Sequence, residues 1–108
     1  MSIKNVDKRY VSLKCVLTQA YDEASIGKGH ERHATEANFE DQQLCQDLRA
    51  FGVSPALYQI RKKALEVDRL NYHHQKNELL GIIIYAAAAV IELEREEQNV
   101  LSNNNNEG

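Results

Sequence analysis

The densest group of chemically versatile side chains lies in Gly27–His33, which reads Gly-Lys-Gly-His-Glu-Arg-His. Glycines free the backbone, and lysine and arginine side chains bind phosphate oxygens, so this stretch is typical of an anion or nucleotide contact. It is not a Walker A loop, which needs more spacing and a following Ser or Thr. The alternative is a solvated loop anchored by a salt bridge. The candidate ligand-binding or partner-binding residues are Lys28, His30, Glu31, Arg32 and His33.

Carboxylates spaced along the expected helices form a second candidate site. An all-helical nucleotide pyrophosphohydrolase holds magnesium with acidic residues three or four apart on facing helices, because the metal needs several carboxylates beside the phosphates. Acidic residues at helical spacing also occupy ordinary solvated faces, and we favour that simpler interpretation. We therefore expect no catalytic residues and no cofactor. The alternative is a magnesium-dependent enzyme, and the candidate ligands of the metal are Glu36, Glu40, Asp41, Glu66 and Glu78.

The histidines and cysteines match no specific metal or redox signature. The histidines occur in two pairs, at positions 30 and 33 and at positions 73 and 74, with a spacing that fits no zinc motif. Cys15 and Cys45 occur without a secretory signal, so we expect free, buried thiols in a bacterial cytoplasm rather than a disulfide. No Ser-His-Asp order, activated cysteine motif or dinucleotide-binding glycine pattern is present.

Apolar periodicity and breaker residues predict three helices before the apolar run. The first starts at Val6, is capped by Ser2 or Asn5, and buries a stripe that includes Leu13 and Leu17. It ends at Gly27, and a connecting loop follows. A short second helix starts after Asn38 and stops at Gly52. A third begins at Ser54-Pro55, with serine as the cap, and buries Leu57 and Ile60.

The polar stretch Asn71–Gln75 interrupts the third helix, either as a turn or as a bend in one continuous helix, and we favour the turn. Leu79–Ile91 follows, in which all thirteen residues are apolar or small. A bilayer requires about 20 such residues. Four alanines and the lack of any strand partner favour a helix over a buried strand. Three short helices cover such a helix incompletely, so we expect the protein to self-associate.

Composition agrees with one folded domain. Of the 108 residues, 43% are hydrophobic and 27% are charged, as in ordinary globular proteins. The net charge of −3 argues against nucleic acid or an anionic membrane as the main partner.

We predict an all-α fold, a small bundle of three to four helices around a very apolar C-terminal helix. Residues 1–101 would form the domain, and residues 102–108, rich in asparagine, a disordered tail.

Two stretches together resemble small helical accessory proteins encoded by bacteriophages and prophages, namely residues 27–34, Gly-Lys-Gly-His-Glu-Arg-His-Ala, and residues 78–88, Glu-Leu-Leu-Gly-Ile-Ile-Ile-Tyr-Ala-Ala-Ala. The resemblance implies a role in an infected or lysogenic bacterium, by binding and inhibiting a host protein or by sequestering a nucleotide. Glu78-Leu79-Leu80-Gly81 also resembles the acidic helix of MazG-like nucleotide pyrophosphohydrolases, although that family has a carboxylate where Gly81 stands. We expect a binding protein rather than an enzyme.

Overall fold

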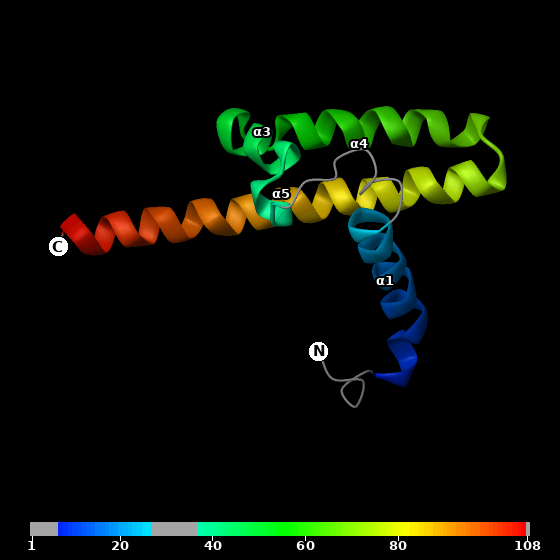
Figure 1. Ribbon diagram of the computed structural model, residues 1–108, viewed down its shortest axis with the longest axis horizontal. Coiled ribbons are helices and arrows are strands. Elements are labelled where there is room, and N and C mark those ends of the chain that lie inside the picture. Colours follow the sequence, from blue (N-terminus) through cyan, green and yellow to red (C-terminus); the bar gives the residue numbers. More distant parts are fainter. Residues whose placement is uncertain (1–6, 27–36, 108) are drawn as a thin grey trace.

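The computed structural model describes residues 7–26 and 37–107, and every regular element in these ranges is helical (Figure 1). The predicted all-α class is therefore confirmed. Across these ranges, no helix combines the length and apolarity needed to cross a membrane. The elements in chain order are the short 3-10 turn η2 (Lys8–Tyr10), α1 (Val11–Ser25), the 3-10 turn η3 (Phe39–Asp41), α3 (Gln43–Phe51), α4 (Ser54–Glu66), the 3-10 turn η4 (Val67–Arg69) and α5 (Tyr72–Glu107).

A helical hairpin of α4 and α5 forms the frame of the molecule (Figure 1). The chain turns at Asn71, whose side-chain oxygen accepts a hydrogen bond from the backbone N–H of His74 at 3.1 Å. This satisfies one of the orphan amides in the first turn of α5. Across the turn, Gln75 Nε2 donates to the carbonyl of Val67 at 3.0 Å. The break between the two helices is therefore a turn, as the sequence favoured, but it is shorter than predicted, because Tyr72–Gln75 already belong to α5.

The buried face of α4 differs by one residue from the predicted face. Ala56 is fully buried, whereas Leu57, which we expected in the core, is exposed. Small side chains explain the shift, because Ala56 packs in one cluster with Ala88 and Ala89 of α5 and so lets the two helices approach closely. Ser54 is the first helical residue rather than the cap, a position that Val53 occupies.

At the end of the hairpin away from the Asn71 turn, α3 contributes side chains to the core. Cys45 and Leu48 of α3 are buried in the same cluster as the alanines of α4 and α5. Between α3 and α4 the chain reverses at Gly52, whose φ of 78° belongs to the left-handed region that favours glycine. The predicted stop of this helix at Gly52 is confirmed.

Helix α1 contradicts the prediction of a buried stripe. Leu13 and Leu17 are 56% and 46% exposed, and Ala20 is the buried residue of the helix. The physical reason is that only the last turns of α1 lie on α5, while the rest projects away from the hairpin (Figure 1). Helix α1 begins at Val11 after η2, and Asp7 accepts a hydrogen bond from the backbone N–H of Arg9 at 2.9 Å. The expected caps and the expected end at Gly27 lie outside the described residues.

Helix α5 continues to Glu107, through the segment expected to be a disordered tail from Ser102 onward. Each residue added to an existing helix gains a hydrogen bond without a new nucleation cost, which explains the extension. The C-terminal part of α5 runs past α3, and no other described element lies beside it (Figure 1).

Candidate functional site

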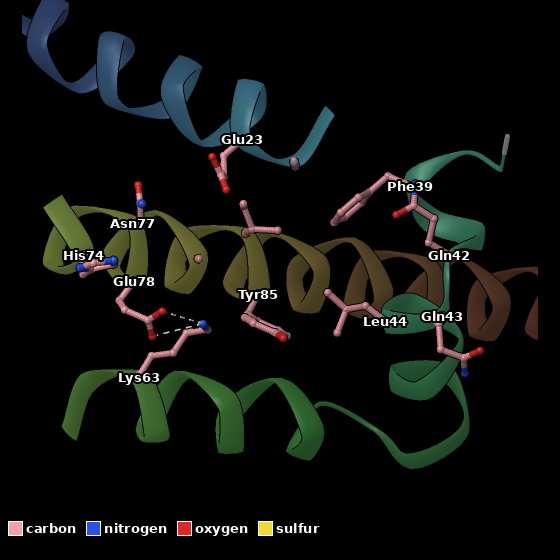
Figure 2. Close-up of a pocket in the computed structure, with 13 residues that line it drawn as sticks. Glu23, Phe39, Gln42, Gln43, Leu44, Lys63, His74, Asn77, Glu78 and Tyr85 are labelled. Atoms are coloured by element: carbon pink, nitrogen blue, oxygen red, sulfur yellow. Dashed lines mark hydrogen bonds and ion pairs between the residues drawn. The ribbon is translucent and has the colours of Figure 1, made fainter. Parts of the chain in front are cut away.

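A cavity of about 250 Å³ lies where α1, η3, α3, α4 and α5 meet (Figure 2). Its lining is apolar on one side, with Phe39 and Leu44, and polar on the other, with Glu23 and Asn77. The volume falls just below the range of about 300 to 1,000 Å³ that is usual for ligand pockets. The cavity therefore suits only a small polar molecule.

An ion pair between Lys63 of α4 and Glu78 of α5 forms the floor of this cavity (Figure 2). Lys63 Nζ lies 3.3 Å from Glu78 Oε2, and the two side chains are 21% and 27% exposed. The lysine side chain passes over Gly81, where a Cβ would lie in ordinary contact at 3.4 Å from Lys63 Cε. The same ammonium lies 5.9 Å from the centroid of the Tyr85 ring, within reach of a cation–π interaction.

Apart from Glu23, the charged and polar groups of the cavity are engaged or neutral. The ammonium of Lys63 balances the charge of Glu78 and leaves that carboxylate little free charge to offer a metal or an anion. Glu23, on the opposite wall, comes from α1, so the cavity lies between α1 and the hairpin. The remaining polar groups are the amides of Gln42, Gln43 and Asn77 and the imidazole of His74, which donate and accept hydrogen bonds but do not form a nucleophile and base pair.

A second ion pair joins α3 to α5 outside the cavity. Arg49 Nη2 lies 3.0 Å from Oε1 of Glu92, and Arg49 Nε lies 3.2 Å from the same oxygen. Glu92 is only 6% exposed, and its hydrogen bond to Arg49 raises the pKa of the guanidinium. Arg49 also donates to the carbonyl of Glu40, which holds η3 in place. The ion pair is structural, because the contacts of Arg49 join α3, η3 and α5.

The two cysteines have different environments. Both are free thiols; Cys45 is buried, as predicted, but Cys15 is exposed, which contradicts that prediction. Cys15 lies five residues before Ala20, the buried residue of α1, and its side chain is exposed. Burial raises the pKa of the Cys45 thiol to about 11, and the nearby carboxylate of Glu92 adds to the shift. Cys45 is therefore protonated at neutral pH and is not a nucleophile.

Of the candidate magnesium ligands that the structure describes, namely Glu40, Asp41, Glu66 and Glu78, only Glu78 lines the cavity. Glu40 and Glu66 are exposed and do not line the cavity, while Glu78 is held by Lys63. In residues 7–26 and 37–107, no three histidine, cysteine or acidic side chains gather as a metal site would require. Six of the predicted site residues lie outside the described residues, namely Lys28, His30, Glu31, Arg32, His33 and Glu36.

Sequence reasoning did not single out Lys63. The signal was available in the turn at Asn71, because Lys63 and Glu78 lie at similar distances along the chain from it. In an antiparallel helical hairpin such positions meet across the interface. The pair therefore follows once the interruption is interpreted as a tight turn.

The fold places the protein in the class of small all-α bundles. Comparison of the chain with family models, curated proteins and solved structures gave no match. Its function is therefore argued from its own surfaces and charges.

Proposed function

We propose that this protein works by binding rather than catalysis, and that α1 captures an amphipathic helix of another protein. The observation that carries the proposal is the apolar stripe of α1, which we call the α1 stripe. It runs along Tyr10, Leu13, Leu17, Ala20 and Ala24, with the three-four spacing of one helix face. At its C-terminal end it packs against α5, and toward its N-terminus it is uncovered.

The α1 stripe is unusual because a single face is covered at one end and bare at the other. Ala20 is buried and Ala24 is half-buried, whereas Tyr10, Leu13 and Leu17 on the same side are exposed. Tyr21 flanks them and is exposed as well. Adjacent exposed aromatic and leucine side chains are typical of protein interaction surfaces. The stripe thus offers a second helix an apolar face to pack against.

The total surface of the chain supports an interaction role. Its accessible surface is 8591 Å², whereas a compact monomer of this mass exposes about 6,100 Å². The radius of gyration is 16.3 Å, against about 13 Å for a compact domain of this length. A chain with this much uncovered helix gains stability by covering it with partners.

Charge indicates the partner's chemistry. Lys8 lies beside the exposed end of the α1 stripe, while the charge of Arg9 is balanced by Asp7 at 2.8 Å. We therefore expect a helix with acidic residues next to its apolar face, since complementary charge speeds association and fixes orientation. A bacterial host protein inhibited by binding is the partner that the phage-type resemblance implies.

The test compares a variant with negative charges on the α1 stripe with a variant that carries the same charges on other faces of α1. The double substitution Leu13→Glu with Leu17→Glu adds two charges to the α1 stripe, and Ser12→Glu with Thr18→Glu adds the same charges to other faces of α1. Proteins captured from a bacterial lysate by the wild type and by the control, but not by the stripe variant, would support the proposal. Equal capture by both variants would contradict it. Circular dichroism checks that all three forms stay helical.

The alternative, a magnesium-dependent nucleotide pyrophosphohydrolase, is tested separately. Incubation with a panel of nucleoside triphosphates and magnesium should release no pyrophosphate, because Lys63 engages Glu78 and the other described candidate ligands lie away from the cavity. Pyrophosphate release that is lost in Glu78→Gln but kept in Glu66→Gln would overturn the binding proposal in favour of catalysis.

A further inference from the structure

Helix α5 carries a second uncovered apolar face, which we call the α5 seam. It consists of Leu79, Ile83, Ala86, Val90 and Leu93, of which Ile83 is half-buried and the others are exposed. They follow one another at alternating intervals of four and three residues, which is the repeat of a coiled-coil seam. Leu79 and Val90 are 50% and 52% exposed, although leucine and valine at such spacing normally lie in a helix interface.

The α5 seam lies across the helix from the face that packs on the rest of the bundle. Residues two apart on a helix point about 200° away from each other. Ala88 packs in the core, and Glu92 binds Arg49 of α3. Ala86 and Val90, each two residues earlier, therefore point away from that face. The very apolar helix predicted from the sequence thus has one apolar face covered by its own chain and another left open.

Two charges that flank the α5 seam indicate what covers it. Lys76 and Glu94 are 18 residues apart, about five helical turns, so they project from the same side of α5. Lys76 also lines a shallow pocket with Asp22 and Glu23 of α1. Glu97 lies on the seam beyond Leu93. A parallel second copy would set these carboxylates against their own equivalents. An antiparallel copy instead brings lysine to glutamate and also opposes the two helix dipoles favourably.

We propose that α5 pairs in antiparallel fashion with α5 of a second copy of this chain. A two-fold axis close to Tyr85 then packs Leu79 against Val90 of the partner subunit and sets Lys76 beside Glu94 of the partner subunit. The chain exposes roughly 2,500 Å² more than a compact monomer, whereas a stable interface buries only about 1,200 to 2,000 Å² in total. The pairing uses a different helix from the α1 stripe, so it does not rest on the proposed function.

A charge exchange tests the antiparallel direction. Lys76→Glu and Glu94→Lys should each weaken the dimer by roughly tenfold, because each places like charges together at both ends of the seam. The double variant should return to within about twofold of the wild type, since the attraction is restored with the signs exchanged. Sedimentation velocity at several concentrations measures the dissociation constants. A dimer that neither single variant weakens, or a double variant that associates no better than the single variants, would overturn the proposal.

Disulfide trapping tests the register. In a Cys15→Ser background, Leu79→Cys and Val90→Cys are prepared separately and oxidised alone and as a mixture. Copies of position 79 would lie about 16 Å apart along an antiparallel seam, beyond the roughly 7 Å that a disulfide spans. We expect a crosslinked dimer only in the mixture. Crosslinking of either variant by itself, or none in the mixture, would contradict the arrangement.

A third pair of variants tests whether the α5 seam is the interface. Val90→Glu places a charge on the seam, and Gln98→Glu adds the same charge at an exposed position off the seam. Val90→Glu should weaken the dimer by more than about 30-fold, the effect of losing a central interface residue, and Gln98→Glu should change it little. A wild-type chain that stays monomeric in light scattering at high concentration would overturn the proposal.

Discussion

Arg49 of α3 binds the buried carboxylate of Glu92 at 3.0 Å and so fastens α3 to the middle of α5. Arg49→Met would leave Glu92 buried and unpaired, and breaking such a pair is strongly destabilising. We expect a melting temperature lower by roughly 5 °C or more in differential scanning calorimetry. Arg95→Met, which removes an exposed arginine of α5, is the matched control and should melt close to the wild type. Equal melting of the two variants would show that the Arg49 pair contributes nothing.

Gly81→Ala should stabilise the protein. Gly81 lies within α5, where glycine is less favourable than alanine by about 0.5 to 1 kcal/mol. The new methyl group would meet Lys63 at 3.4 to 3.6 Å, which is ordinary contact. The free energy of unfolding in urea should therefore rise by about this amount. A decrease would mean that the lysine needs the space above Gly81.

Gly52→Ala should have the opposite effect. No atom lies within 4 Å of the position that a Cβ would take, so crowding plays no part. Gly52 has φ 78° and ψ −166°, a conformation that only glycine adopts readily, and a side chain there costs about 1 to 3 kcal/mol. The urea midpoint should fall accordingly. An unchanged midpoint would show that the turn between α3 and α4 adapts without cost.

Thiol chemistry should separate the two cysteines. At pH 8, Ellman's reagent should label exposed Cys15 at once, whereas Cys45 should react only as fast as the core opens, because it is buried and its pKa is about 11. The one-cysteine variants Cys15→Ser and Cys45→Ala assign the phases. Rapid labelling of the Cys15→Ser variant would contradict the burial of Cys45.

The raised pKa of Cys45 also makes stability depend on pH. Folding holds the thiol protonated, so this contribution is complete below the ordinary value of 9.0 and is lost as pH rises toward about 11. Between those values the wild type should lose more unfolding free energy than Cys45→Ala. Parallel pH profiles for the two proteins in urea titrations would rule out this effect.

The sequence predicts the breaks between helices at Gly52 and Asn71 better than it predicts which faces the helices bury. Gly52, Asn71 and the apolar run at Leu79 act through local backbone preferences, and their interpretation as a helix stop, a turn and a helix is confirmed. The buried face of α4 depends instead on the fit of Ala56 against small residues of α5. That fit exists only in the assembled pair, so periodicity within α4 alone missed it by one residue.

The candidate site was also hard to predict, because its residues come together only in the folded chain. Lys63 and Glu78 look like ordinary solvated charges on separate helices, and only the hairpin brings them to 3.3 Å. The stripe of α1 was predicted correctly as an apolar face, but its exposure depends on the angle at which α1 leaves α5. Local sequence carries no information on that angle.

The most direct test of the binding function is site-specific photo-crosslinking from α1. Benzoylphenylalanine replaces Leu17 on the α1 stripe or, as the control, Ser12 on another face, and each protein is irradiated in a bacterial lysate. We predict a covalent adduct with a different protein from position 17 and none from position 12. Equal adducts from both positions, or an adduct at position 17 only with a second copy of this chain, would contradict the account.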